Sequence, residues 1–175
     1  MRDADTAMYR AKAQGKGRHA IAAAKIEPGQ LVIELTESVL IEKLAVARPH
    51  LGSLRDLGVQ VSIDDFGTGY SSFSMLHELP INVIKIDRSF VARLGADDNG
   101  HEVVRAILTL GRTLDKTMIA EGVETEAQLQ QLIEMRCEMG QGYLLGRPMP
   151  ADEAGRMVSA YASGQGTAFA SPVIG

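Results

Sequence analysis

Short apolar runs, each followed by a loop and a stretch with helical periodicity, repeat along the sequence from Leu31 onward. Nearly continuous apolar runs that alternate with helices are typical of parallel strands, because crossover helices cover the faces of a parallel sheet. The pattern therefore predicts an α/β fold, and it allows either a doubly wound sheet or a barrel. The predicted strands are LVIELT at 31–36, VQVSIDD at 59–65, NVIKID at 82–87, TMIAEG at 117–122 and a weaker run, MGQGYLL, at 139–145.

Helical periodicity occupies the intervals between these runs. Pro49 lies inside the first interval, and proline suits a first helical turn but disrupts a helix interior. We therefore expect that helix to begin effectively near His50. The glycine-, serine- and alanine-rich tail from Gly164 is expected to fray. The predicted helices are 3–14, 43–57, 99–115, 125–136 and 151–162.

Length, charge and cysteine content limit the classes of function. The 175 residues fit one ordinary domain, and the net charge of −4 argues against polymeric nucleic acid as a partner, since such binding needs a basic surface. A small anionic ligand that binds through a metal ion is compatible with this net charge. The single cysteine, Cys137, excludes an intramolecular disulfide and a multi-cysteine zinc site, and we expect it to be buried.

The sequence contains no apolar run long enough for a membrane span and no apolar core of a signal peptide at its start. We therefore expect a cytoplasmic location. Neither a G-x-S-x-G nucleophile motif nor a glycine-rich phosphate loop occurs, so acyl transfer and P-loop chemistry have no support. The four histidines show no metal-ligand spacing.

Polar residues stand at the end of every predicted strand. Because the carboxyl ends of parallel strands share one edge of a sheet, these residues should converge in space. Carboxylates gathered there repel one another, and a single lysine cannot balance four of them. Oxygen ligands favour Mg²⁺ or Mn²⁺, and a two-metal site suits phosphodiester hydrolysis. The residues are Glu34, the adjacent pair Asp64 and Asp65, Lys85, Glu121 and Gln141.

Each of these residues also fits a simpler interpretation. A carboxylate after a strand often caps a helix or forms an ion pair. The DDFGTG segment at 64–69 suits a turn, because its glycines accept positive φ. Lys85 also fits a lysine whose stem is buried and whose ammonium reaches water, or a lysine that forms a Schiff base. Gln141 alone indicates little. The residue types leave these alternatives open.

Five motifs occur in an order that resembles the EAL-domain family of cyclic di-GMP phosphodiesterases, over about residues 27–161. The resemblance implies a TIM-like barrel with one antiparallel strand, and hydrolysis of cyclic di-GMP to linear pGpG. The motifs are ELTES at 34–38, DDFGTGYSS at 64–72, KIDRSF at 85–90, AEGVET at 120–125 and QGYLLGRP at 141–148.

The resemblance also implies a role for individual residues. Glu34 and Asp64 would bind the first metal and Asp65 the second, while Glu121 would join the metal and its water. Lys85 would orient that water and the scissile phosphate, so Glu121 and Lys85 form the implied catalytic pair. Other implied residues are the supporting or substrate-binding Glu124, Gln141, Arg147 and Pro148, the loop brace Glu37, and a hinge of Phe66, Gly67, Thr68 and Gly69 that links dimerisation to metal binding.

The sequence also departs from the family pattern. The E-A-L tripeptide and the family's early asparagine ligand are absent, and Arg136 replaces a usual glycine. Residues 4–20 resemble the last helix of a GGDEF domain. We therefore expect a GGDEF remnant at 1–24, a partial EAL domain at 25–163 and a flexible tail at 164–175.

The expected fold is an incomplete TIM-like barrel of about five βα units with an extra N-terminal helix, because a closed barrel needs about 250 residues. Its open strand edges would invite a homodimer or the missing half of the barrel in trans. Activity of the chain alone should then be weak or absent. The alternative is a non-catalytic module that binds cyclic di-GMP or a protein.

Overall fold

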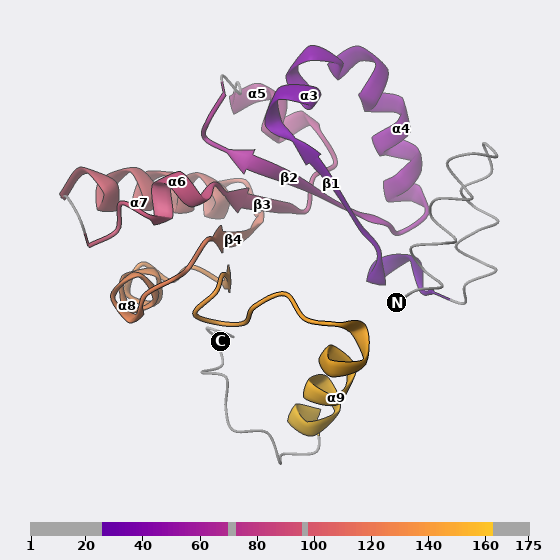
Figure 1. The fold of residues 1–175 in the computed structure, drawn as a ribbon. Helices are drawn as coiled ribbons and strands as arrows, with labels where there is room; N and C mark the ends of the chain where they lie inside the picture. The colour runs from indigo at the N-terminus through magenta and orange to yellow at the C-terminus, as the bar shows by residue number, and fades with distance from the viewer. Residues whose placement is uncertain (1–25, 70–72, 96–97, 163–175) are drawn as a thin grey trace.

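A computed structural model of the protein describes residues 26–69, 73–95 and 98–162. These residues form one five-stranded sheet with helices packed against it (Figure 1), which confirms the predicted α/β fold with five strands. The helix predicted at 3–14 and the tail from residue 164 lie outside the described residues. Within the described ranges, no helix is long and apolar enough to cross a membrane.

All strand pairs of the sheet are parallel, and each strand pairs with the next one along the chain. The carboxyl ends of all the strands therefore lie at one edge. In the register, Thr36 stands beside Asp64, and Glu121 stands beside Gln141. The strands are β1 (Val32–Thr36), β2 (Gln60–Phe66), β3 (Val83–Ile86), β4 (Thr117–Glu121) and β5 (Met139–Gln141).

Helices connect the strands and cover the sheet. The helices predicted at 99–115, 125–136 and 151–162 are present within a few residues of their predicted ends. Three short helices, α3, α5 and α6, were not predicted, because four to six residues are too few to show a helical period. The helical elements are η1 (Pro28–Gln30), α3 (Glu37–Glu42), α4 (Leu44–Asp56), α5 (Phe73–Glu78), α6 (Arg88–Val91), α7 (Asp98–Thr113), α8 (Glu126–Glu134) and α9 (Ala151–Ala162).

The expected start of the first long helix near His50 is wrong, because Pro49 lies inside α4. The first turn closes before the proline: the amides of Val46 and Ala47 donate to the Lys43 carbonyl at 3.0 and 2.8 Å. Pro49 removes only one donor of the helix. Leu51, only 2% exposed, packs into the core and holds the helix beyond the proline.

The core lies between the sheet and its helices. Its centre is built from alternate residues of β2 and β3, and Val61, Ile63, Ile84 and Ile86 are almost completely buried. Cys137 is also buried, as predicted, and burial raises the pKa of its thiol to about 11. This alternation leaves the other face of the same strands free for polar residues.

Arg136 adopts a left-handed backbone conformation with φ of 56° immediately after α8. Its amide donates to the Ile133 carbonyl, and the Cys137 amide donates to the Leu132 carbonyl, both at 2.9 Å. This is the Schellman arrangement that ends many helices, and it normally uses glycine at the left-handed position. This conformation explains why glycine suits the position. Arginine can adopt it only at a conformational cost.

Substitution of Arg136 by glycine should therefore stabilise the protein. We expect Arg136→Gly to raise the free energy of unfolding by about 1 kcal/mol, because glycine adopts this φ without steric strain. Urea denaturation followed by circular dichroism measures the change. Arg156→Gly in α9 is the control, and it should lower stability because glycine is unfavourable within a helix. A loss of stability in Arg136→Gly would contradict the strain argument.

Candidate functional site

The carboxyl edge of the sheet gathers acidic side chains around one buried lysine. Lys85 of β3 is 5% exposed. Its Nζ lies 3.1 Å from Glu34 Oε1, 3.1 Å from Asp64 Oδ1 and 2.6 Å from Glu121 Oε1. These carboxylates come from β1, β2 and β4, so strands on both sides of β3 contribute. We call Glu34, Asp64, Asp65 and Glu121 the acidic rim.

Strand alternation explains why the polar side chains share one face. Ile84 and Ile86 lie in the apolar core, so Lys85 between them points to the opposite face. In β2 the same alternation separates Ser62 and Asp64 from the buried Ile63. Ser62 Oγ is fully buried and has no hydrogen-bond partner among the described residues. Ser62 is not among the predicted site residues, although its spacing of two from Asp64 places it on the polar face.

The charges of the acidic rim alter the pKa values at its centre. Burial alone would lower the pKa of Lys85, but its hydrogen bonds to Glu121, Asp64 and Glu34 outweigh burial and raise it above the ordinary value. Burial raises the pKa of Glu121, the ion pair with Lys85 opposes this effect, and the charges of Asp64 and Glu34 add to it. One ammonium therefore serves three carboxylates and leaves an excess of negative charge.

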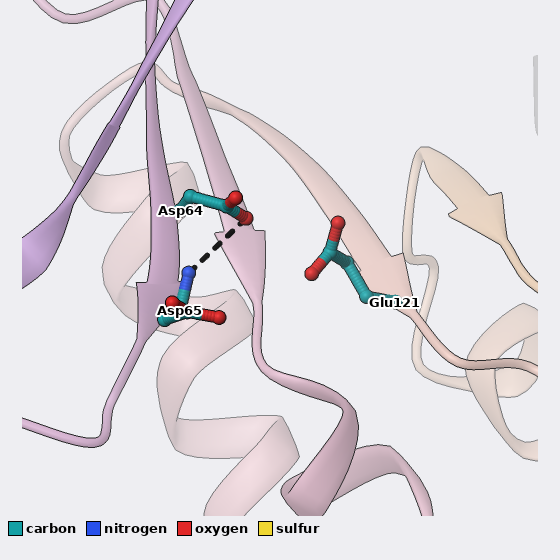
Figure 2. Close-up of side chains that lie close together, drawn as sticks. All are labelled: Asp64, Asp65 and Glu121. Carbon is teal, nitrogen blue, oxygen red and sulfur yellow. Dashed lines mark hydrogen bonds between the residues drawn. The ribbon is translucent and has the colours of Figure 1, made fainter.

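Asp65 joins this cluster because the strand is irregular at its end. Neighbouring residues of a regular strand point to opposite faces, but the register of β2 with β3 shifts between Ile63 and Phe66, and Asp65 has a φ of 55°. One carboxylate oxygen each from Asp64, Asp65 and Glu121 lies within 4.8 Å of the others (Figure 2). The Asp65 amide also donates to Asp64 Oδ1 at 3.2 Å.

This donor set fits a hard divalent cation. Carboxylate oxygens are the ligands that Mg²⁺ and Mn²⁺ favour, and an additional cation would offset the excess negative charge. Asp64, Asp65 and Glu121 would hold such an ion, with Glu34 beside them on Lys85. None of the described histidines belongs to this group.

Glu37 fixes the loop that follows β2. Its side chain is 1% exposed, and Oε2 accepts hydrogen bonds from the amides of Gly67 at 2.9 Å and Gly69 at 3.2 Å. Gly67 has a φ of +101°, and a β-carbon there would lie 2.7 Å from the Phe90 ring. Thr68 Oγ1 donates to the Asp65 carbonyl at 2.9 Å, which links the loop to the acidic rim.

The remaining predicted residues lie on β5 and in the segments after β4 and β5. Gln141 is aligned with Glu121, and its carbonyl accepts from the Val123 amide at 3.0 Å. The Glu124 amide donates to Gln128 Oε1 at 2.8 Å. Arg147 lies over the Tyr143 ring, 4.7 Å from its centroid, and is exposed, as is Pro148. Among the described residues, no ion pair joins Glu124 or Arg147 to the acidic rim.

Removal of the central ammonium should destabilise the protein. We expect Lys85→Met to lower the free energy of unfolding by about 3 kcal/mol at pH 8, because it leaves partly buried carboxylates without their cation. The pKa of Glu121, already raised, should rise further, and a raised carboxyl pKa reduces stability as pH increases through it. Denaturation at pH 5 should show a smaller loss than at pH 8. An equal loss at both values would contradict the electrostatic cause.

Neutralisation of Glu37 should loosen the loop. We expect Glu37→Gln to lower stability by about 2 kcal/mol, because a buried charged acceptor of two amides is lost. Hydrogen exchange at the Gly67 and Gly69 amides should also become faster. Glu42→Gln on the same helix is the matched control: Glu42 is exposed, so its change should stay within about 0.5 kcal/mol. Unchanged exchange at both glycines would show that Glu37 does not hold the loop.

The family model described as the EAL domain matches residues 5–148. A relative from Pseudomonas aeruginosa, the bifunctional diguanylate cyclase/cyclic di-GMP phosphodiesterase MucR, is 46% identical over 136 residues, which cover 78% of this chain and 20% of MucR. The structure of the MucR phosphodiesterase in complex with cyclic di-GMP superimposes with a TM-score of 0.77 and 45% identity, over 80% of this chain and 57% of that one.

Two further solved structures are similar. The EAL domain of Mycobacterium smegmatis DcpA has a TM-score of 0.78 at 38% identity, over 83% of this chain and 65% of that chain. Klebsiella pneumoniae BlrP1, in complex with manganese and cyclic di-GMP, has a TM-score of 0.72 at 33% identity, over 78% of this chain and 35% of that chain.

This chain spans about a fifth of the length of its curated relatives, such as the 20% of MucR. The part that matches is the part that carries the acidic rim, since the family match includes all five strands. The fold, the acidic rim and the family match agree, and the chain belongs to the EAL domain family.

Proposed function

We propose that this chain supplies the metal-binding rim of a phosphodiesterase that hydrolyses cyclic di-GMP to linear pGpG. The observation that carries this proposal is the acidic rim, in which carboxylates from separate strands surround Lys85 and leave an excess of negative charge. Two similar proteins support the substrate: MucR is described as a cyclic di-GMP phosphodiesterase, and BlrP1 binds cyclic di-GMP with manganese.

Mg²⁺ or Mn²⁺ held by the acidic rim would supply an activated water and positive charge at the scissile phosphate. Glu34 and Asp64 would bind the first ion and Asp65 the second, with Glu121 shared between metal and water. Lys85 is already held by three carboxylates, so its ammonium has a fixed direction. Because its three N–H donors face Glu34, Asp64 and Glu121, one of these carboxylates would turn to the metal and free an N–H that orients the attacking water or a phosphate oxygen.

The residues around the rim would bind and position the substrate. Gln141 and Glu124 would support the catalytic groups, and Arg147 with Pro148 would lie beside the substrate at the exposed end of β5. Glu37 holds the glycines of the loop after β2. We propose that this loop, residues 66–69, couples dimerisation through α5 to the position of Asp65.

The described strands do not close a barrel. An eight-stranded TIM barrel takes about 250 residues, whereas the described part of this chain has five strands in one open sheet. Both outer strands of the sheet expose apolar side chains: Val32 of β1 is 43% exposed and Met139 of β5 is 49% exposed. Val158 of α9 is 64% exposed. We propose that strands from another segment or a second chain cover these surfaces and supply the remaining metal ligands. The chain alone would then be weakly active or inactive.

The sequence before the described part suggests a tandem arrangement. We propose that residues 1–24 are the end of a GGDEF domain and that the EAL portion extends over residues 25–163, followed by a tail at 164–175. This boundary rests only on the resemblance of residues 4–20 to a GGDEF domain. The EAL family match does not mark it, because that match begins at residue 5.

A turnover assay tests the proposed function. The chain would be incubated with cyclic di-GMP and Mn²⁺, alone and mixed with a separately produced first half of the MucR EAL domain, and pGpG would be measured by chromatography. We expect little product from the chain alone and clear product from the mixture. Asp64→Asn should lower that activity by about 100-fold, because metal ligation depends on it. Asp56→Asn, an exposed acid outside the rim, is the matched control.

Other outcomes have defined meanings. Rapid hydrolysis by the chain alone would contradict the claim that it needs other strands. Calorimetric binding of cyclic di-GMP in Ca²⁺, with no product under any condition, would favour the non-catalytic binding module. Activity of Asp64→Asn equal to that of the unmodified chain would contradict the role of the acidic rim.

A further inference from the structure

A second polar site lies between α7 and α8, which neighbour each other on the same side of the sheet (Figure 1). It is an open surface pocket with a volume of about 480 Å³. Three guanidinium groups and a histidine line it beside a single carboxylate, although the whole chain has a net charge of −4. We call it the basic pocket, lined by His101, Arg105, Arg112, Glu134, Met135 and Arg136.

Helix periodicity brings the cations of α7 together. His101, Arg105 and Arg112 are spaced by four and seven residues, so they share one face of the helix. Arg105 Nη2 lies 3.2 Å from His101 Nδ1, and Arg105 Nη1 lies 3.9 Å from an oxygen of Glu102. Arg105 is thus partly occupied by its own helix.

Arg112 and Arg136 have no carboxylate within ion-pair distance among the described residues. Arg112 Nη1 donates to the Met135 carbonyl at 3.0 Å, which directs its guanidinium toward the end of α8. The carboxylate of Glu134 accepts from Gln130 Nε2 at 3.1 Å instead. Arg112 and Arg136 therefore line one pocket, and neither is neutralised by a carboxylate among the described residues.

The backbone of Arg136 is a second and independent observation. The Schellman turn after α8 favours glycine, yet an arginine occupies its left-handed position with φ of 56°. The side chain is exposed, so packing in the core does not explain its presence. Strained residues concentrate where a side chain has a functional role. Here the residue with the strained backbone is an arginine that lines the basic pocket.

We propose that the basic pocket binds a phosphate-bearing small molecule, held mainly by Arg112 and Arg136. Guanidinium groups match phosphate oxygens with paired hydrogen bonds, and the cavity has the size of small-molecule sites, which run roughly from 300 to 1,000 Å³. The site differs from the acidic rim in place as well as charge. Arg136 precedes β5 and therefore lies toward the amino edge of the sheet, opposite the carboxyl edge that carries Glu121.

Calorimetric titration with inorganic pyrophosphate tests this proposal. The buffer contains EDTA, so that no divalent ion can bridge pyrophosphate to the acidic rim, and the result is independent of the phosphodiesterase proposal. We expect saturable binding with a rise in the melting temperature. Arg112→Gln and Arg136→Gly should each weaken binding by about tenfold, because each removes charged hydrogen bonds to phosphate. Arg156→Gln, an exposed arginine on α9, should bind as the unmodified chain does.

Arg136→Gly is the decisive variant, because it should stabilise the fold while it weakens binding, and loss of folding cannot then explain the result. Citrate at equal ionic strength should bind at least tenfold more weakly if the pocket recognises phosphate. The proposal is overturned if pyrophosphate shows no saturable binding, if Arg136→Gly binds it with unchanged affinity, or if citrate binds equally well.

Discussion

The contact of one buried ammonium with carboxylates from three strands organises this structure. Lys85 can be buried only because Glu34, Asp64 and Glu121 surround it, and these residues can approach one another only because Lys85 reduces their repulsion. The parallel order of the strands provides the geometry, since consecutive strands end at one edge. The ion pairs therefore depend on the fold, and they leave an excess of negative charge that defines what the edge can bind.

Glu37 extends this arrangement from the strands to the loop. Glu37 is the first residue of α3, directly after β1. The segment that carries Glu34 therefore also carries the side chain that binds the loop after β2. Asp65 lies just before that loop, and its left-handed backbone turns its carboxylate toward Asp64 and Glu121. A change in the position of α3 or the loop would thus alter the oxygen cluster. This connection makes the geometry of the oxygen cluster depend on the position of the loop.

Much of the fold was predictable because strand periodicity and polar strand ends are local features of the sequence. The grouping of Glu34, Asp64 and Glu121 was predicted because parallel strands end at the same edge of a sheet.

Other features depend on contacts between elements that are distant in the sequence, and local patterns do not reveal them. Pro49 stays inside α4 because bonds to Lys43 and burial of Leu51 hold the helix on both sides of it. The carboxylate of Asp65 faces Asp64 and Glu121 because the register of β2 with β3 shifts. The sequence of one strand alone does not predict such a shift. The pocket at Arg112 and Arg136 requires two helices to pack, and nothing in the sequence analysis predicted it.

The two polar sites place opposite charge at opposite edges of one sheet. At the acidic rim, a phosphodiester would meet uncompensated carboxylates, so an anionic substrate can bind there only together with a cation. At the basic pocket, Arg112 and Arg136 have no carboxylate partner among the described residues and would attract phosphate without a metal. The two sites would therefore bind phosphate groups in ways that differ in their need for divalent ions. Metal concentration would then alter binding at the acidic rim and leave the basic pocket unchanged, because carboxylates line one site and arginines the other.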